Sequence, residues 1–177
     1  MEKLQISNSI KIDIYDSQDY IQNNKQINDY LNKVLGSVST FYARDYLDNL
    51  NGDIYIQDKK VFIFVLFESD EPASFVIYSK KSNITASLDL IWTSEEYQKL
   101  GFATMLIRVS AAVLKDKNIA TILAEATEQD EIFFNLLQSF AKVENIETKQ
   151  EERKFKFGIK ELDAKQILDD VKKFAIW

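Results

Sequence analysis

Apolar and polar positions alternate at the start of the chain and then change to helical spacing. Residues 4–14 follow a period of two, interrupted at Asn8-Ser9, which predicts half-buried strand structure with a turn or kink. In residues 20–35 the apolar side chains recur every three or four positions, as is typical of an amphipathic helix. A second helix is predicted between Ser39, as its N-cap, and Gly52, at its end.

The middle of the chain predicts a set of strands joined by short turns. Val61–Phe67 is an unbroken apolar run, so both of its faces should be covered. The chain then turns at Asp70–Pro72, returns through Phe75–Tyr78 and continues in a strand at Thr85–Thr93. Asp53–Gln57 is predicted as a short extra strand before them. Because the connections are short, these neighbours should pair antiparallel.

Helices and strands alternate beyond residue 100. The predicted elements are a helix over 102–114, a strand at Ile119–Ala126, a helix that begins at Asp130 or in a capping box from Thr127, a hairpin of Val143–Glu147 and Lys154–Lys160, and a helix from about Asp163. Within the helix after Asp130, the residues expected to point inward are Ile132, Phe133, Leu136, Leu137 and Phe140. No internal repeat or linker interrupts the pattern, so residues 1–177 are expected to form a single domain.

One of the four glycines lies where a glycine is costly. Gly36 and Gly52 follow helical patterns, where a residue with positive φ is wanted, and Gly158 lies in a predicted strand. Gly101 instead falls at the opening of a helix, where glycine costs about 1 kcal/mol relative to alanine. Close approach of a ligand to bare backbone would offset that cost.

The segment around Gly101 resembles a cofactor-binding motif. Gln98-Lys99-Leu100-Gly101-Phe102-Ala103 follows the pattern Gln/Arg-x-x-Gly-x-Gly/Ala of the acetyl-CoA-binding loop in the GNAT superfamily of N-acetyltransferases. In that family the backbone N–H groups of the loop and the helix N-terminus hold the pyrophosphate of the cofactor. The resemblance therefore implies acetyl-CoA as co-substrate, bound by Gln98, Lys99, Leu100, Gly101, Phe102, Ala103 and Thr104.

The predicted order of elements is also similar to the GNAT fold, over residues 1–160. That fold is α/β, with a mixed, mainly antiparallel central sheet flanked by helices on both faces. A strand followed by a glycine-bearing helix start also suits a Rossmann-type protein, but the full G-x-G-x-x-G and the run of βαβ units are missing. Residues 161–177 form an extra C-terminal helix, which packs either on the sheet or against a second subunit in a homodimer.

The composition removes several classes of chemistry. Without cysteine there is no disulfide, thiolate zinc site or thiol nucleophile, and without histidine there is no Ser-His-Asp triad, so no metal is expected. Direct transfer between two bound substrates needs neither residue. No apolar run reaches the roughly 18 residues of a membrane span. Residues 1–16 lack the apolar stretch of a signal peptide, so we expect no membrane contact and a cytoplasmic location.

The resemblance further implies where pantetheine binds. In GNAT proteins the strand before the glycine loop parts from the following parallel strand, and the opening admits pantetheine. In this chain the backbone groups of Ile91, Trp92 and Thr93 should bond its amides. The acetyl carbonyl would lie against a strand N–H, which is an oxyanion-type donor.

The acceptor amine must lose a proton, so the site needs a base or a chain of water molecules. Since the chain lacks histidine, the candidate residues are the carboxylates Asp89, Glu125 and Glu128. Aspartate is unfavourable inside a strand, which singles out Asp89. A solvent-facing position on an alternating strand would equally explain Asp89.

The helix after Asp130 departs from the family pattern. GNAT proteins often carry Phe-Tyr-x-x-x-Gly-Phe there, and the tyrosine protonates the leaving thiolate. Here Asn135 stands in the tyrosine's place and Ser139 in the glycine's. Asparagine can hydrogen-bond a thiolate but cannot protonate it. The function implied is an acetyl-CoA-dependent N-acetyltransferase that acts on an amine directly, and the alternative is a catalytically silent module that binds CoA or a protein.

The excess of acidic over basic residues gives information about the charge of the acceptor. A net charge of −6 argues against nucleic acid and favours a cationic amine, although ordinary solubility charge would also account for it. Tyr42 and Tyr46 either line a substrate cleft or belong to the core with their hydroxyls reaching water. The acidic residues near the segments predicted to form a cleft are Asp45, Asp48, Asp53, Glu125 and Glu128.

Overall fold

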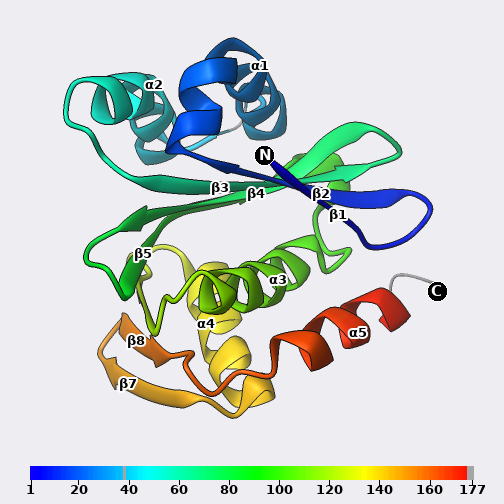
Figure 1. Ribbon diagram of the computed structural model, residues 1–177, viewed down its shortest axis with the longest axis vertical. Coiled ribbons are helices and arrows are strands. Elements are labelled where there is room, and N and C mark those ends of the chain that lie inside the picture. Colours follow the sequence, from blue (N-terminus) through cyan, green and yellow to red (C-terminus); the bar gives the residue numbers. More distant parts are fainter. Residues whose placement is uncertain (38, 175–177) are drawn as a thin grey trace.

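The computed structural model describes residues 1–37 and 39–174 as one sheet with helices on both faces (Figure 1). The helices α1 and α2 cover one face, and α3 and α4 cover the other, with α5 packed outside α3 (Figure 1). Each face encloses its own apolar core. This arrangement confirms the predicted fold class.

The described residues contain eight strands and five α-helices. The strands are β1 (Glu2–Gln5), β2 (Ile10–Asp16), β3 (Val61–Glu68), β4 (Glu71–Lys80), β5 (Thr85–Thr93), β6 (Thr121–Glu125), β7 (Glu147–Glu151) and β8 (Lys154–Gly158). The helices are α1 (Ser17–Leu35), α2 (Phe41–Tyr55), α3 (Phe102–Asp116), α4 (Glu131–Glu144) and α5 (Ala164–Phe174), and a short 3₁₀ turn covers Glu95–Tyr97.

The sheet has the order β1-β2-β3-β4-β5-β6-β8-β7. Successive strands from β1 to β5 pair antiparallel, as do β6 with β8 and β8 with β7. The pair β5–β6 is parallel, and α3 forms the crossover between these two strands. A sheet with this topology excludes the Rossmann alternative, which needs successive parallel units.

Local chemistry fixes the ends of α1. Asp16 accepts a hydrogen bond from the N–H of Asp19, and Asp19 accepts one from the N–H of Asp16, so a capping box begins the helix. At the other end Gly36 has a φ of 62°, a conformation that glycine adopts without a steric cost. The predicted helix and its C-terminal glycine are both confirmed.

The predicted boundaries of α2 are wrong at both ends. Thr40, not Ser39, is the N-cap, because its hydroxyl accepts the N–H of Ala43. The helix continues through Gly52 to Tyr55, so Asp53–Gln57 does not form a strand. Burial of Ile54, one helical turn after Leu50, favours the helix, and Gly52 is not at positive φ.

The region of α4 also differs from the prediction. The helix extends to Glu144 and ends where Asn145 takes the left-handed conformation, so the strand expected at Val143–Glu147 is replaced by β7 at Glu147–Glu151. Val143 and Ile146 are three positions apart, which is a helical spacing and not the period of two of a strand, and Val143 lies on the last turn of α4. Ile132 was expected inside the core but is 85 % exposed on the first turn of α4.

The C-terminal helix packs within the chain against α3 and not directly on the sheet, which was one of the two arrangements expected. Ile167 and Val171 are buried in the core shared with α3 and α4. Arg108 of α3 forms an ion pair with Glu144 of α4 and lies 3.7 Å from the carboxylate of Asp170 on α5. Residues 175–177, which the predicted helix included, lie outside the described residues.

Among the described helices, none is long and apolar enough to span a bilayer.

Replacing Ile167 by alanine should lower the free energy of unfolding by about 2–5 kcal/mol, because a side chain that is 3 % exposed leaves a cavity between α3 and α5. Ile132→Ala makes the same chemical change at an exposed helical position and should change that free energy by no more than about 0.5 kcal/mol. Urea unfolding of both variants provides the test. Equal losses would contradict the placement of α5 against α3.

Candidate functional site

Two neighbouring strands part in the middle of the sheet. β5 and β6 pair from Thr85 with Thr121 to Leu88 with Ala124, and β5 then continues to Thr93 without pairing to β6. The second half of β5 therefore has backbone groups on one side that no strand satisfies. Unpaired backbone groups inside a sheet bind water or a ligand.

A β-bulge lies where the two strands part. Along the β4–β5 pair, Ile77 lies opposite Leu90 and Tyr78 lies opposite Leu88, so Asp89 is the extra residue on β5. Leu88 belongs to the core under α3, whereas Leu90 belongs to the core under α1 and α2. The bulge thus reverses the alternation along β5.

The side chain of Asp89 points toward α2. The hydroxyl of Tyr46 donates to its Oδ2 at 2.9 Å, and the ammonium group of Lys59 lies 3.4 Å from the same oxygen. The hydroxyl of Tyr42 donates to the backbone carbonyl of Asp89 at 3.2 Å. With 11 % of its side chain exposed, Asp89 is not the solvent-facing residue of the alternative interpretation.

Lys59 links Asp89 to a second carboxylate. Its ammonium group lies 3.6 Å from Asp53 Oδ2 and 5.2 Å from the centre of the Tyr46 ring. Burial raises the pKa of the Tyr46 phenol well above its usual value, and the Asp89 carboxylate raises it further. Tyr46 is therefore a neutral hydrogen-bond donor at physiological pH.

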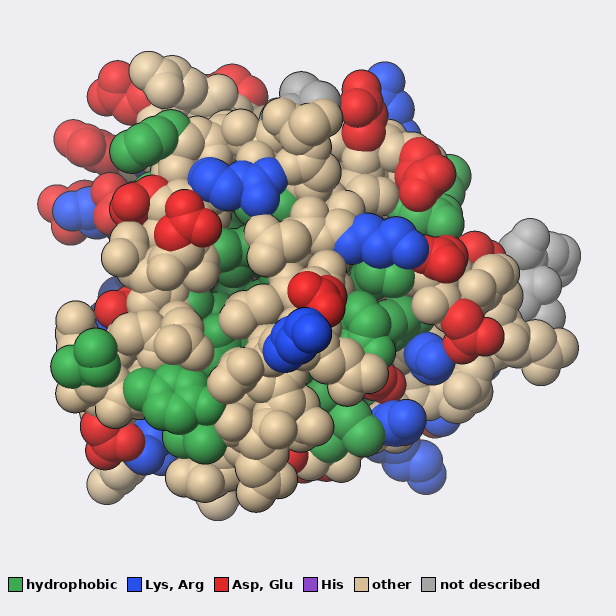
Figure 2. Space-filling model, turned by 90° about the horizontal axis from the view of Figure 1, so that it is seen from above, with side chains coloured by type: hydrophobic (Ala, Val, Ile, Leu, Met, Phe, Trp, Pro, Cys, Tyr) green, Lys and Arg blue, Asp and Glu red, His purple; other side chains and the backbone are tan. Residues whose placement is uncertain are grey.

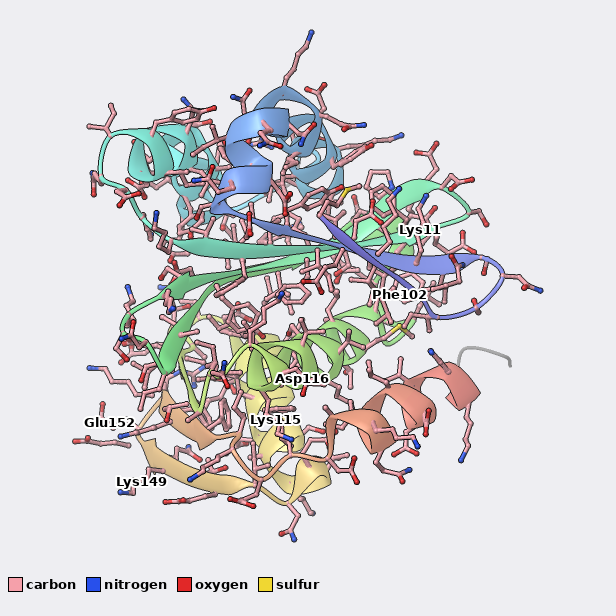
Figure 3. All side chains as sticks on the ribbon, in the orientation of Figure 1. Lys11, Phe102, Lys115, Asp116, Lys149 and Glu152 are labelled. Atoms are coloured by element: carbon pink, nitrogen blue, oxygen red, sulfur yellow. The ribbon has the colours of Figure 1, made fainter. Side chains whose placement is uncertain are left out.

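The loop before α3 carries a row of free backbone donors. Among the described residues, the N–H groups of residues 99–104 donate no hydrogen bond to backbone or side chain. Lys99 and Gly101 both have positive φ, at 64° and 83°. Such alternation turns successive N–H groups toward one side, and the start of α3 adds its positive dipole end. Figure 3 shows Phe102 at this end of α3 and Asp116 at the other.

The backbone conformation explains why a glycine stands at position 101, and the sequence interpretation missed this reason. It is the N-cap of α3, where glycine is well tolerated, and it has a left-handed conformation. The cost assigned to a glycine inside a helix therefore does not apply. A Cβ at this position would meet no protein atom within 4 Å, so the space beside it is open to a ligand.

Of the three residues predicted to bind pantetheine, two direct their backbone N–H and C=O groups toward the opening and one directs them toward β4. The N–H of Ser94 bonds to the carbonyl of Ala73 on β4, and groups on successive residues of a strand point to opposite sides. The groups of Trp92 consequently face β4, and its carbonyl also accepts the Ser74 hydroxyl at 2.9 Å. Those of Ile91 and Thr93 face the opening.

The other predicted catalytic residues lie apart from this cluster. Glu125 ends β6 and is the register partner of Lys154, Glu128 follows in the β6–α4 loop, and Asn135 lies on α4. All three are exposed, and no hydrogen bond or ion pair within the described chain joins them to Asp89. Asp45 and Asp48 are likewise exposed on α2. Among these described acidic residues, only Asp53 shares an ion-pair partner with Asp89, namely Lys59.

Tyr46 and Lys59 are the site residues that the sequence did not assign. Tyr46 was left open between cleft and core; its ring packs against the core, and its hydroxyl donates to Asp89. Lys59 lies in a segment without periodicity, so no pattern could reveal it. Figure 2, which views the α1–α2 side, shows basic side chains scattered singly rather than gathered in a patch.

A mainly antiparallel sheet whose one parallel pair opens beside the start of a helix is the α/β arrangement expected from the sequence resemblance. The chain belongs to the acetyltransferase (GNAT) family, whose family model matches residues 26–136, more than half of its length. No curated protein matches the chain at the significance required.

Solved structures of GNAT proteins are similar to the whole fold. PaiA N-acetyltransferase from Thermoplasma acidophilum, in complex with coenzyme A, is 14 % identical with a TM-score of 0.53 over 84 % of this chain and 97 % of that one. Tetrahymena GCN5 is 13 % identical with a TM-score of 0.58 over 85 % and 99 %. The ribosomal-protein-S18-alanine N-acetyltransferase of Escherichia coli is 15 % identical with a TM-score of 0.53 over 84 % and 90 %. At these identities the likeness establishes the fold.

The raised pKa of Tyr46 predicts a loss of stability at alkaline pH. Above about pH 10 the unfolded chain releases this proton while the folded chain keeps it, so the free energy of unfolding falls by up to about 1.4 kcal/mol per pH unit from this group. Tyr46→Phe should make the fall less steep. Urea unfolding at a series of pH values from 9 to 11 measures both slopes. Identical slopes would contradict the burial of Tyr46 beside Asp89.

Proposed function

We propose that the protein is an acetyl-CoA-dependent N-acetyltransferase that transfers the acetyl group directly to an amine. The observation that carries this proposal is the opening between β5 and β6, which lies next to the unpaired N–H groups of residues 99–104. Membership of the GNAT family supports it, as does the coenzyme A bound by a structural relative.

The chain's own groups fit the cofactor. The N–H groups of residues 99–104 are donors for the pyrophosphate, and the open space beside Gly101 permits close approach. The outward groups of Ile91 and the N–H of Thr93 offer an edge for the pantetheine amides, while the Thr93 carbonyl accepts the Gln98 side-chain amide at 3.4 Å. When bound, acetyl-CoA supplies the acetyl group as a thioester.

Asp89 is the residue proposed to receive the proton of the acceptor. It lies at the bulge where the strands part, and its contacts with Tyr46 and Lys59 both meet Oδ2. No hydrogen bond to Oδ1 occurs among the described residues, so this oxygen has the capacity to accept. Glu125 and Glu128 are the alternative bases, and Asn135 is the proposed hydrogen-bond donor to the thiolate.

The acceptor is proposed to approach from the side of α1 and α2. Residues 99–104 hold the cofactor at the start of α3, on the opposite face of the sheet, whereas the side chain of Asp89 points toward α2. A second carboxylate, Asp53, lies on the same side. These charges favour an amine with cationic character as the acceptor.

Coenzyme A should bind with micromolar affinity, about −8 kcal/mol, and Gly101→Glu should abolish binding by placing a side chain and a negative charge in the anion site. Gly36→Glu is the matched control. Gly36 also has positive φ and no protein atom within 4 Å of its Cβ position, but it lies at the end of α1. Calorimetry on the three proteins, with thermal melts to confirm folding, gives the answer.

Two results would contradict the cofactor site. The absence of heat and of a thermal shift at millimolar coenzyme A would remove the proposed function. Equal binding by the Gly101→Glu variant would move the site elsewhere. Binding without turnover of acetyl-CoA toward any amine would instead identify a catalytically silent module.

Asp89→Asn should lower kcat by roughly 10²-fold or more while coenzyme A affinity stays unchanged, because the amide cannot accept the proton. Asp58→Asn makes the same change at an exposed residue of the α2–β3 connection and serves as control. Glu125→Gln and Glu128→Gln are measured in parallel. A fall of less than threefold for Asp89→Asn, with a larger one for either glutamate, would reassign the base.

A further inference from the structure

We infer that the side chain of Lys59 occupies the subsite in which the acceptor's ammonium group binds, and that an acceptor must displace it. The inference rests on the function proposed above, because it places an acceptor amine beside Asp89. It adds to that function the class of acceptor, a primary alkylammonium, and a residue that competes with it.

The groups around the Lys59 ammonium are those that bind an alkylammonium ion. Two carboxylates, of Asp89 and Asp53, lie at 3.4 Å and 3.6 Å, and the Tyr46 ring centre lies at 5.2 Å. An aromatic ring and carboxylates together stabilise an ammonium group by cation–π and Coulomb attraction. Since two carboxylates face one ammonium group, the cluster keeps a net negative charge and retains affinity for a cation.

The position of the cluster matches the path of the acceptor. Asp89 is the bulge residue at which β5 leaves β6, and the cofactor loop lies on the other face of the sheet. An amine that reaches the opening from the α1–α2 side therefore meets the groups that hold Lys59. Tyr42 and Tyr46 both donate to Asp89 and fix its orientation.

The backbone of Lys59 is fixed by hydrogen bonds, whereas its side chain is free to change rotamer. Residues 58–60 belong to no helix or strand, yet the backbone of Lys59 is anchored, since its N–H bonds to the Asp53 carbonyl at 3.0 Å and its carbonyl accepts the Ser17 hydroxyl at 3.3 Å. The side chain is already 26 % exposed. A change of rotamers is then sufficient to move the ammonium group into water, where it is strongly hydrated.

The experiment uses n-butylammonium as the probe and calorimetry on protein saturated with coenzyme A. Lys59→Met should bind the probe at least about 10-fold more tightly than the wild type, because a tethered competitor with a millimolar effective concentration is removed. Neutral n-butanol should show no such gain. Lys60→Met is the matched control, since the neighbouring lysine pairs with Asp58 at 2.7 Å outside the cluster. The double variant Lys59→Met, Asp89→Asn should lose the gain.

Each outcome separates this inference from the proposed function. If coenzyme A binds but Lys59→Met gains no affinity for the probe, the inference is wrong and the acetyltransferase assignment stands. If coenzyme A does not bind, the proposed function is wrong. Mass spectrometry that finds an acetyl group on Lys59 after incubation with acetyl-CoA would also overturn the inference, because Lys59 would then be an acceptor itself. Lys59→Gln is the second variant should the methionine protein fail to fold.

Discussion

The site depends on the point where parallel pairing between β5 and β6 stops. A parallel pair inside an otherwise antiparallel sheet requires a crossover, here α3, and the crossover places the start of a helix beside the end of β5. The bulge at Asp89 adds one residue on β5 just after the last pair, at Leu88 and Ala124. The parting of the strands, the helix dipole and the carboxylate at the bulge therefore lie together at one end of the parallel pair.

The two faces of the sheet at this opening differ in electrostatic potential. Under α3, free N–H groups at residues 99–104 create positive potential without any basic side chain being required. Under α1 and α2, Asp53 and Asp89 create negative potential around an ammonium group. In the proposed function, an anionic cofactor and a cationic amine are each favoured on a different face, and they would meet through the opening between the strands.

Much of the fold could be predicted from sequence, because burying one face of a helix or strand gives its apolar residues a regular spacing. Thr85–Thr93 was predicted with its observed ends, and Asp130 was correctly named as one possible start of α4. Errors occurred at the ends of helices, as at Gly52, which lies inside α2, and at Val143, which lies on the last turn of α4. The bulge could not be predicted, because an extra residue in one strand is defined by its partner strand. Its effect on Leu90 is invisible in the sequence of β5 alone.

The candidate site was predictable only where it is local in sequence. The loop around Gly101 carries a motif, although the left-handed conformation, and not a penalty inside a helix, accounts for the glycine. The surroundings of Asp89 come from α2 and the segment before β3, more than 25 residues away, and no spacing connects them. Lys59 shows the difference most clearly. In the sequence it is one of several turn lysines, whereas in the fold its ammonium group is held by the carboxylate that an acetyl acceptor would need. On the inference drawn above, the acceptor displaces this ammonium group, so stability and activity are opposed at Lys59.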